Sequence, residues 1–381
     1  MNDRGALLER AFSPHEHVDD EARFVGRVHE LTRVRGVAAQ RGLHLVIYGD
    51  PGTGKTSLAL TGTRAHAPSR RLVVVCGKNQ VFSDVCREVA LQLVAAFPAG
   101  YEFDAAANCI RHQGASFPAA AVTRDVIRFL LPKGDDPLVV VVDEIDRIQR
   151  KDTLAELAEF AKYLSTTLPH VHLVLVGVAK DADALLDGHA SNVRTLSLIQ
   201  LDRMQESELL QVLAQGLAEL SLDIEEAARD DLVALSDRSP YYLKLLAREA
   251  AEKAIERAAL VLTRVDLQAG LRVAADKAAP KLQSEYEVAI ASGKGVMTFE
   301  DVVHALARLP KVRVSTGEVV AEVEQIARAR GDKPVTPARI SQALKELSES
   351  ERRCIVSTER QVWWFTKPMM RTWVRVRMGA T

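Results

Sequence analysis

A run of nine residues, GDPGTGKTS, combines three glycines with a lysine and two kinds of hydroxyl side chain. It extends from Gly49 to Ser57 and follows the apolar stretch LHLVIY (43–48), which is typical of a buried β-strand. Glycine lets the backbone turn sharply and direct its N–H groups inward. A helix predicted to begin at Lys55 adds the positive end of its dipole. The spacing matches G-x-x-x-x-G-K-[ST] and predicts a phosphate-binding loop rather than an incidental flexible turn.

The side chains of this loop have separate expected roles. Lys55 is expected to reach the β- and γ-phosphates of a nucleotide, and the Thr56 hydroxyl to ligate Mg²⁺. The predicted cofactors are therefore ATP and Mg²⁺. The motif assigns nucleotide binding to Gly49, Asp50, Pro51, Gly52, Thr53, Gly54, Lys55, Thr56 and Ser57.

A second motif supplies the carboxylates that such a loop requires. The apolar run LVVVV (138–142) is typical of a central parallel strand covered on both faces, and Asp143 and Glu144 follow it directly. Asp143 is expected to hold Mg²⁺ with Thr56, and Glu144 to polarise a water for attack on the γ-phosphate. A solvated acidic turn is the alternative, but the glycine loop upstream favours the catalytic interpretation.

The composition excludes several other classes of protein. The 381 residues carry a net charge of −1, so any attraction to nucleic acid must be local. Four cysteines without C-x-x-C spacing indicate neither a zinc site nor a disulfide framework. The first residues lack the apolar core of a signal peptide, and no apolar run is long enough to span a bilayer. We therefore expect a cytoplasmic protein with no membrane partner.

Alternating apolar runs and helical patterns predict an α/β fold. The candidate parallel strands are 43–48, 71–76, 138–143, 171–176 and 195–200. The helical patterns between them favour a parallel sheet with right-handed crossovers, with the nucleotide at the carboxyl ends of the strands. The stretch 97–121 is rich in Gly, Pro and Ala and interrupts this pattern, so it is predicted to be a long loop or insertion.

The two phosphate motifs, GDPGTGKT and VVVVDEID, resemble those of AAA+ ATPases, within the P-loop proteins that have an additional strand and a catalytic glutamate. The segment ARFVGRVHELTRV (22–34) resembles the one that precedes the P-loop in initiator-type (origin-recognition-like) AAA+ proteins and in STAND ATPases. In those families it lines the adenine pocket, which implies that Val25, Gly26 and Arg27 lie near the base. The resemblance extends over roughly residues 20–275.

Three further positions follow from this resemblance. The families place a polar sensor of the γ-phosphate, often Asn or Thr, after the fourth core strand, where this sequence has Lys180. Arg194 occupies the place of an arginine that projects into a neighbouring subunit's ATP site, which would make Arg194 catalytic and the protein a homo-oligomer. Pro240 begins the helix that resembles the second sensor, although the sequence around it matches neither family fully. A solvated Lys180 and a locally paired Arg194 are the alternatives.

The carboxyl-terminal half is predicted to be helical at first, because apolar residues recur three and four positions apart after Met204. These helices resemble the AAA+ lid. Residues 316–331 and 333–350 then predict two further helices, the second capped by Thr336 with Pro337 at its first position. Two strands around a turn at 358–360 complete an order that resembles a winged helix. The expected domains are an α/β P-loop AAA+ module (1–203), a helical lid (204–279) and a winged-helix domain (280–381).

The last part of the chain is basic. Between Lys333 and Thr381 there are ten Lys or Arg and four Asp or Glu, a balance of +6. A basic helix-turn-helix module is typical of proteins that bind double-stranded DNA. The predicted DNA-binding residues are Arg339, Gln342 and Lys345 on the second helix and Arg360 at the tip of the wing. A winged helix used only for protein contacts is the alternative.

Two functions of different class fit these patterns. The first is an AAA+ ATPase that oligomerises and acts on or with DNA, in an initiator-like, transposition-helper or defence-type role. The second is a STAND-like signalling ATPase, whose ATP state controls assembly with a separate partner or effector protein without DNA. A nucleotide-binding scaffold that hydrolyses little is a third, and fold alone does not separate them.

Overall fold

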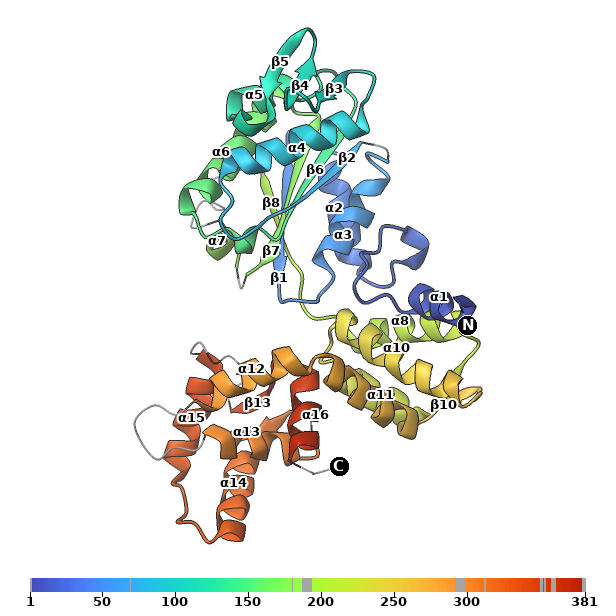
Figure 1. Ribbon diagram of the computed structural model, residues 1–381, viewed down its shortest axis with the longest axis vertical. Helices are drawn as coiled ribbons and strands as arrows, with labels where there is room; N and C mark the ends of the chain where they lie inside the picture. Colours follow the sequence, from blue (N-terminus) through green and yellow to red (C-terminus); the bar gives the residue numbers. More distant parts are fainter. Residues whose placement is uncertain are drawn as a thin grey trace. The chain divides into compact units, whose positions relative to one another are not determined.

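The computed structural model describes residues 2–68, 70–179, 181–186, 194–291, 299–311, 313–349, 352, 354–357 and 361–378 (Figure 1). The chain divides into two compact units. One is His15–Glu208, and the other combines Met1–Pro14 with Leu209–Thr381. Contacts thus join the predicted lid and carboxyl-terminal segments in one unit, and the division into three domains stays a prediction.

A five-stranded parallel sheet forms the centre of the unit 15–208. Its strands are β1 (His44–Gly49), β2 (Arg71–Val75), β6 (Leu138–Asp143), β7 (Val171–Val178) and β8 (Leu196–Gln200), in the order β2-β6-β7-β1-β8. Every pair is parallel, with Leu45 of β1 and Val141 of β6 both opposite Val174 of β7. The predicted α/β parallel-sheet class is therefore confirmed.

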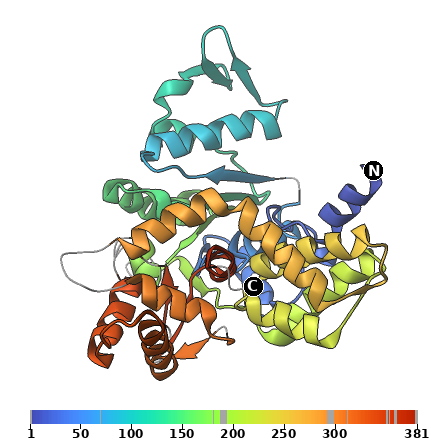
Figure 2. The same ribbon diagram turned by 60° about the horizontal axis from the view of Figure 1, so that its bottom comes forward.

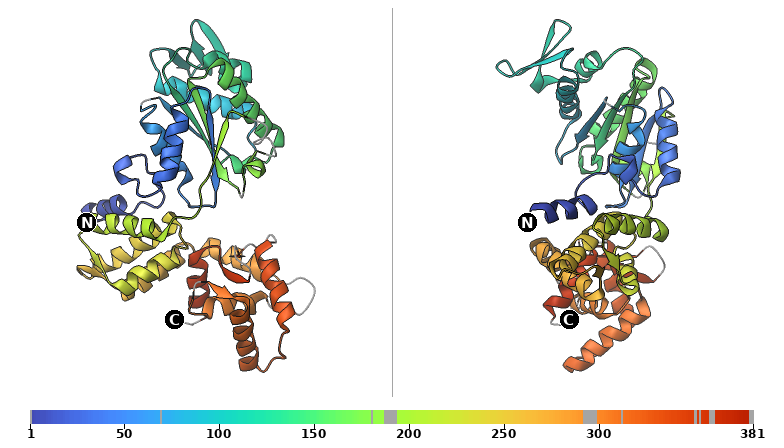
Figure 3. Two further views of the ribbon diagram at one scale, coloured as in Figure 1. Left: turned by 180° about the vertical axis from the view of Figure 1, so that it is seen from behind. Right: turned by 90° about the vertical axis from the view of Figure 1, so that its right-hand side faces the viewer.

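Helices cover both faces of this sheet, as Figure 3 shows. On one face Leu31, Val34 and Leu58, from helices α2 (Val28–Ala38) and α3 (Lys55–Arg64), pack with Val139 and Val141. On the other face, α4 (Phe82–Ala96) and α6 (Lys151–Thr167) pack with the alternate residues of β6. Burial on both faces explains why β6 is apolar throughout. The remaining helices of this unit are η1 (Glu21–Arg23), η2 (Ala119–Ala121), α5 (Arg124–Leu130), η3 (Ile145–Arg147) and α7 (Ala182–Leu185).

The stretch 97–121, predicted to be a long loop or insertion, is a folded insertion rather than a loop. It forms an antiparallel meander of β3 (Tyr101–Asp104), β4 (Cys109–His112) and β5 (Ala115–Pro118), which lies beside α4 (Figure 2). The Tyr101 ring stacks on His112 at 4.2 Å, and Ile110 is fully buried. Gln113 and Gly114 both have positive φ, as a two-residue hairpin turn requires. A strand of four residues is too short to show a clear alternation of apolar and polar residues, and the surrounding Gly, Pro and Ala obscure the pattern further.

The second unit begins with α1 (Asn2–Ala11) and continues through the helices that the sequence predicted after Met204. These are α8 (Glu206–Glu219), α9 (Glu226–Leu235), α10 (Pro240–Glu256) and α11 (Arg264–Lys277). The short strands β9 (Asp223–Ile224) and β10 (Val261–Leu262) pair in parallel. Phe12, after α1, is fully buried against Gly216 of α8, where a Cβ would meet the ring.

The carboxyl-terminal segment contains helices α12 (Ala279–Ile290), α13 (Phe299–Arg308), α14 (Thr316–Arg330), α15 (Pro337–Glu349) and α16 (Pro368–Arg377). Its strands are β11 (Val314–Ser315), β12 (Ile355–Val356) and β13 (Val362–Phe365), in the antiparallel order β11-β13-β12. Ser315 and Glu318 form a capping box at the start of α14. Both predicted helices and the predicted strand pair are present.

We expect His44 to make the unit 15–208 sensitive to acid. Its ring is buried, and Nδ1 accepts the Leu173 N–H at 3.0 Å, so Nε2 carries the proton and donates to the Ala161 carbonyl at 2.7 Å. Burial lowers the pKa of His44 from 6.5 to about 4. Between pH 6.5 and about pH 4 the unfolded chain binds more protons than the folded chain does. The free energy of unfolding should therefore fall as the pH is lowered through this range, by up to about 1.4 kcal/mol per pH unit.

Urea unfolding at pH 7.5 and pH 5 measures this dependence. His44→Gln should lower stability at both values but reduce the difference between them. His17→Gln, at an exposed position, is the control and should keep the full difference. An equal pH dependence in His44→Gln and in the unmodified protein would contradict the assignment.

Candidate nucleotide site

The phosphate loop between β1 and α3 depends on glycine conformations. Gly49, Gly52 and Gly54 have φ of 146°, 73° and 92°, a range that disfavours residues with a Cβ. At Gly49 a Cβ would lie 2.3 Å from the Leu201 carbonyl oxygen. Only glycine at this position therefore lets the backbone pass so close to Leu201, the residue after β8.

Lys55 lies inside this loop. Its side chain is buried, and Nζ donates to the carbonyl oxygens of Gly49 at 3.1 Å and Asp50 at 2.7 Å. Burial lowers the pKa of Lys55, while the carboxylates of Asp146, Asp143 and Asp50 raise it. An ammonium held by carbonyl dipoles in a buried loop is well placed to bind a phosphate.

Thr56 and Asp143 bring α3 and β6 together at the carboxyl edge of the sheet. The Thr56 hydroxyl donates to Oδ2 of Asp143 at 2.6 Å, and the Glu144 N–H donates to Oδ1 at 2.7 Å. A hydroxyl and a carboxylate are hard oxygen ligands of the kind that Mg²⁺ prefers. The two side chains predicted to hold magnesium are thus adjacent, and their donor set fits the ion.

Glu144 follows β6 in a strained conformation. Its φ of 55° places a non-glycine residue in the left-handed region, which is typical of functional sites. Its carboxylate pairs with the Arg147 guanidinium at 3.0 Å, within the turn that forms η3. The pair is substantially exposed to solvent, so it is weak, and Glu144 can exchange Arg147 for a water.

Asp146 and Arg147 are members of this site that the sequence analysis did not assign. Oδ1 of Asp146 accepts the Val178 N–H at 2.7 Å, which fixes the end of β7 beside the Glu144 turn. The sequence could have indicated them, because both residues lie within three positions of Glu144. They are therefore on the same turn after the buried strand β6.

The segment before α2 also reaches the loop. Gly26 and Arg27 have φ of 74° and 57°, and the Arg27 N–H donates to Glu208 at 2.6 Å. The buried Arg27 guanidinium donates to the Asp202 carbonyl and, at 3.4 Å, to the Thr53 carbonyl in the phosphate loop. Arg27 therefore connects the predicted adenine segment with the phosphate loop. The roles of Val25 and Gly26 in binding the base stay predictions.

The structure describes two of the four other predicted residues, Arg194 and Pro240. Arg194 is exposed in the turn before β8. Pro240 is at the first turn of α10, behind Ser239, whose hydroxyl accepts the Tyr242 N–H at 3.4 Å. Lys180 and Arg360 lie outside the residues that the structure describes. The roles of all four stay predictions.

The predicted DNA-binding residues on α15 are exposed: Arg339, Gln342 and Lys345. Gln342 donates to Glu346 at 2.9 Å, and Lys345 lies 3.9 Å from Glu349. These contacts are between exposed side chains of one helix, so they are weak. The helix can present the three residues to a ligand.

The balance of +6 is not a measure of surface charge, which corrects the sequence estimate. Four of the ten basic residues are buried or half-buried against the segment itself: Arg352, Lys367, Arg371 and Arg375. Arg371 and Arg375 donate to carbonyl oxygens at the end of α13, and burial lowers the pKa of Arg371 to about 10. Arg352 donates to carbonyls at the end of α12, and Lys367 pairs with Glu285. Arg377 faces the rings of Tyr286 and Trp373 but stays exposed.

Comparison with known proteins agrees with this geometry. Residues 23–176 match a family model described as "AAA ATPase domain". This segment is an AAA ATPase domain. The match covers the phosphate loop, Asp143 and Glu144, and confirms the predicted relationship to AAA+ ATPases. No curated protein matches the chain.

Solved structures share the fold of nearly the whole chain. A Walker-type ATPase of Pyrococcus abyssi is 14% identical, with a TM-score of 0.58 over 97% of this chain and 99% of its own. The Aeropyrum pernix ORC1 protein, solved in complex with DNA, is 18% identical, with a TM-score of 0.51 over 93% of each chain. The Aeropyrum pernix ORC2 protein, solved as ADPNP–ADP complexes, is 15% identical, with a TM-score of 0.51 over 95% and 98%. At these identities the likeness shows the fold.

Among the helices of the described residues, none is long and apolar enough to cross a membrane.

Lys55→Ala should abolish most ATP affinity of the AAA ATPase domain while preserving the fold. The substitution removes the one ammonium placed within the loop, so a bound triphosphate loses a charged partner, and affinity should fall by roughly 10²-fold. Titration calorimetry measures the affinity. Lys78→Ala, at an exposed lysine beyond β2, is the control and should bind as the unmodified protein does. Unchanged affinity in Lys55→Ala would refute the phosphate assignment.

Proposed function

We propose that this protein is an ATP-hydrolysing AAA+ ATPase that oligomerises and acts on DNA. The observation that carries the proposal is the juxtaposition of Thr56 with Asp143 beside Glu144, at the loop that holds Lys55. A nucleotide-binding domain that only binds has no need for a carboxylate held at that point in a strained conformation.

The residues would act in sequence on a bound ATP with its magnesium ion, which supplies a charge that polarises the γ-phosphate. Backbone N–H groups of the loop and Lys55 would hold the β- and γ-phosphates, and Thr56 and Asp143 would hold the ion. Glu144, once it leaves Arg147, would orient a water and accept its proton. The exposed Arg194 would stabilise the transition state in the site of a neighbouring copy.

DNA binding is supported by two independent features. The carboxyl-terminal elements run helix, strand, helix, helix and strand pair, which is the order of a winged helix, and α15 presents Arg339, Gln342 and Lys345 outward. The ORC1 protein of the same fold was solved in complex with DNA. We infer that α15 lies in a groove or against phosphates.

One observation favours the alternative, a STAND-like switch that assembles with a separate partner protein. Four of the described basic residues are turned toward the segment itself, so the exposed cations that the structure describes on α15 and just before it are Arg339, Lys345 and Lys333. A surface of that charge can serve protein contacts as well as DNA. The DNA measurement below distinguishes the two functions.

Glu144→Gln should leave ATP binding intact and slow turnover by 10²-fold or more, because the amide keeps the shape of the side chain but cannot accept the proton. Phosphate release under saturating ATP measures the rate. Glu159→Gln, on the exposed side of α6, is the control and should hydrolyse normally. Equal turnover in Glu144→Gln and the unmodified protein would remove Glu144 from the mechanism. Turnover per subunit that stays constant on dilution would argue against a shared site.

The full-length protein with ATP should bind duplex DNA mainly through phosphates, with an affinity that falls as salt rises. Arg339→Ala with Lys345→Ala should flatten the salt slope by about one to two units, because each cation neutralises one phosphate. Fluorescence anisotropy at several salt concentrations measures the slope. The control is Lys281→Ala with Arg328→Ala, which removes the same charge from exposed positions on α12 and α14. No binding at low salt would favour the STAND-like switch.

A further inference from the structure

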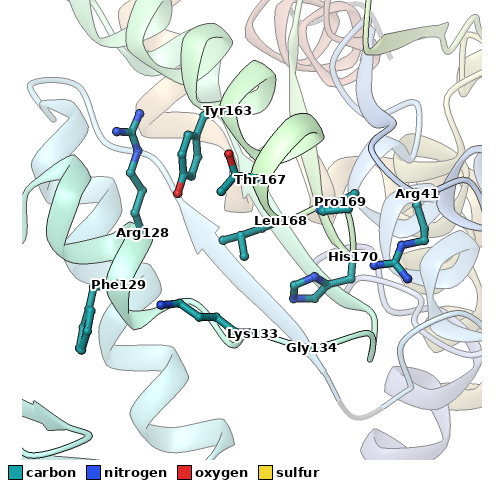
Figure 4. Close-up of a pocket in the computed structure, with 10 residues that line it drawn as sticks. All are labelled: Arg41, Arg128, Phe129, Lys133, Gly134, Tyr163, Thr167, Leu168, Pro169 and His170. Atoms are coloured by element: carbon teal, nitrogen blue, oxygen red, sulfur yellow. The ribbon is translucent and has the colours of Figure 1, made fainter.

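A cavity lies in the unit 15–208, away from the phosphate loop. It has a volume of about 520 Å³, within the range of ligand sites. Figure 4 shows its lining, which consists of Arg41, Arg128, Phe129, Lys133, Gly134, Tyr163, Thr167, Leu168, Pro169 and His170. The residues come from the turn before β1, from α5 with the connection to β6, and from the end of α6 with the turn to β7.

This cavity lies at the amino edge of the central sheet. Its residues precede β1, β6 and β7, which begin at His44, Leu138 and Val171. Lys55 follows the carboxyl end of β1, and Asp143 is the last residue of β6, at the opposite edge. A ligand here would therefore not compete with a nucleotide, and the inference does not depend on the function proposed above.

The lining carries three cations and no carboxylate. The Arg128 guanidinium lies 3.9 Å from the centre of the Tyr163 ring, and Lys133 Nζ lies 5.5 Å from that of Phe129. Such cation–π contacts orient a cation without neutralising it. Among the described residues, Lys133 has no carboxylate partner. The cavity therefore presents positive charge that its own lining does not balance.

The carboxylates that approach from outside are weak competitors for a ligand. Asp125 pairs with Arg128 at 3.3 Å and Asp135 with Arg41 at 2.7 Å. Their side chains are 89% and 86% exposed, and ion pairs between such groups contribute little. An acidic ligand could displace both carboxylates into solvent at small cost.

The apolar part of the lining lies between the cations. Leu168 is buried and extends between Tyr163 and the Lys133 side chain, while Arg41 lies at the far end beyond His170 (Figure 4). We propose that this cavity binds an acidic peptide of a partner protein. Its carboxylates pair with Arg128, Lys133 and Arg41, and an apolar side chain between them packs on Leu168 and Pro169.

A peptide fits this arrangement better than a phosphate does. A compact phosphate is typically held by backbone N–H groups at a helix amino terminus, whereas this cavity is lined by the carboxyl end of α6, Tyr163 to Leu168. The negative end of a helix dipole opposes a concentrated anion. Cations separated by an apolar floor match carboxylates that are spread along an extended chain.

The test is fluorescence anisotropy of the full-length protein with a short fluorescein-labelled peptide of alternating Glu and Leu. A peptide of alternating Lys and Leu serves as the charge control. We expect saturable binding of the Glu–Leu peptide only, weakened about tenfold by Lys133→Glu and similarly by Arg41→Glu, because each removes an attraction and adds a repulsion. Lys162→Glu makes the same charge change on α6 next to Tyr163, at an exposed residue outside the lining, and should bind the peptide normally.

Three results would overturn the proposal. The first is no saturable binding of the Glu–Leu peptide, and the second is equal weakening by Lys133→Glu and Lys162→Glu. The third is displacement of the peptide by an equal concentration of pyrophosphate, which would make the cavity a phosphate site. Affinity for ATP, measured in parallel, should be the same in all three variants.

Discussion

The hydrogen bond between Thr56 and Asp143 is the contact on which the nucleotide site depends. It joins the first turn of α3 to the end of β6 over 87 residues of sequence. Neither group can be placed without the sheet, because β6 reaches β1 only through β7. The buried strands fix the positions of Gly49 and Asp143 at the edge of the sheet. The conformation of the phosphate loop then places Thr56 beside Asp143. A chemical site made of two short motifs thus requires the whole parallel sheet.

The phosphate motifs were predictable because their chemistry is local. The sequence GDPGTGKTS contains the glycines that the loop conformation needs, and the apolar run 138–142 ends at the carboxylates. The contacts of Arg27 with Asp202 and Glu208 were not predictable, since they form between segments about 180 residues apart. Glu144 and Arg147 are close in the sequence, so their pairing could have been considered. The strained turn that brings the two side chains together is seen only in the structure.

Counting charges failed in the carboxyl-terminal segment for a physical reason. Arginine has a long apolar stem and five donors, so it can enter a protein to cap helix ends whose carbonyls lack partners. Arg371 and Arg375 do this at the end of α13, and Arg352 does it at the end of α12. In the sequence, arginines that form a basic surface look the same as arginines that cap helix ends. In α15 the helical periodicity distinguishes outward from inward residues. It places Arg339, Gln342 and Lys345 on the face opposite the buried Ile340 and Leu344.

The turn before α10 is bound to the carboxyl-terminal segment by a buried carboxylate. Asp237 accepts the Trp364 indole N–H at 2.8 Å and an Arg313 N–H at 3.0 Å, and the Arg313 guanidinium lies 4.4 Å from the centre of the Trp364 ring. Asp237 and Arg238 both have positive φ, so the turn is strained and needs these contacts. A buried carboxylate that loses such partners costs roughly 3 kcal/mol or more, which makes separation of the two segments unfavourable. The turn that leads to Pro240 is thus held by β13 and Arg313, and together with the packing of α11 on α12 and α16 it joins the helices α8–α11 to the carboxyl-terminal segment.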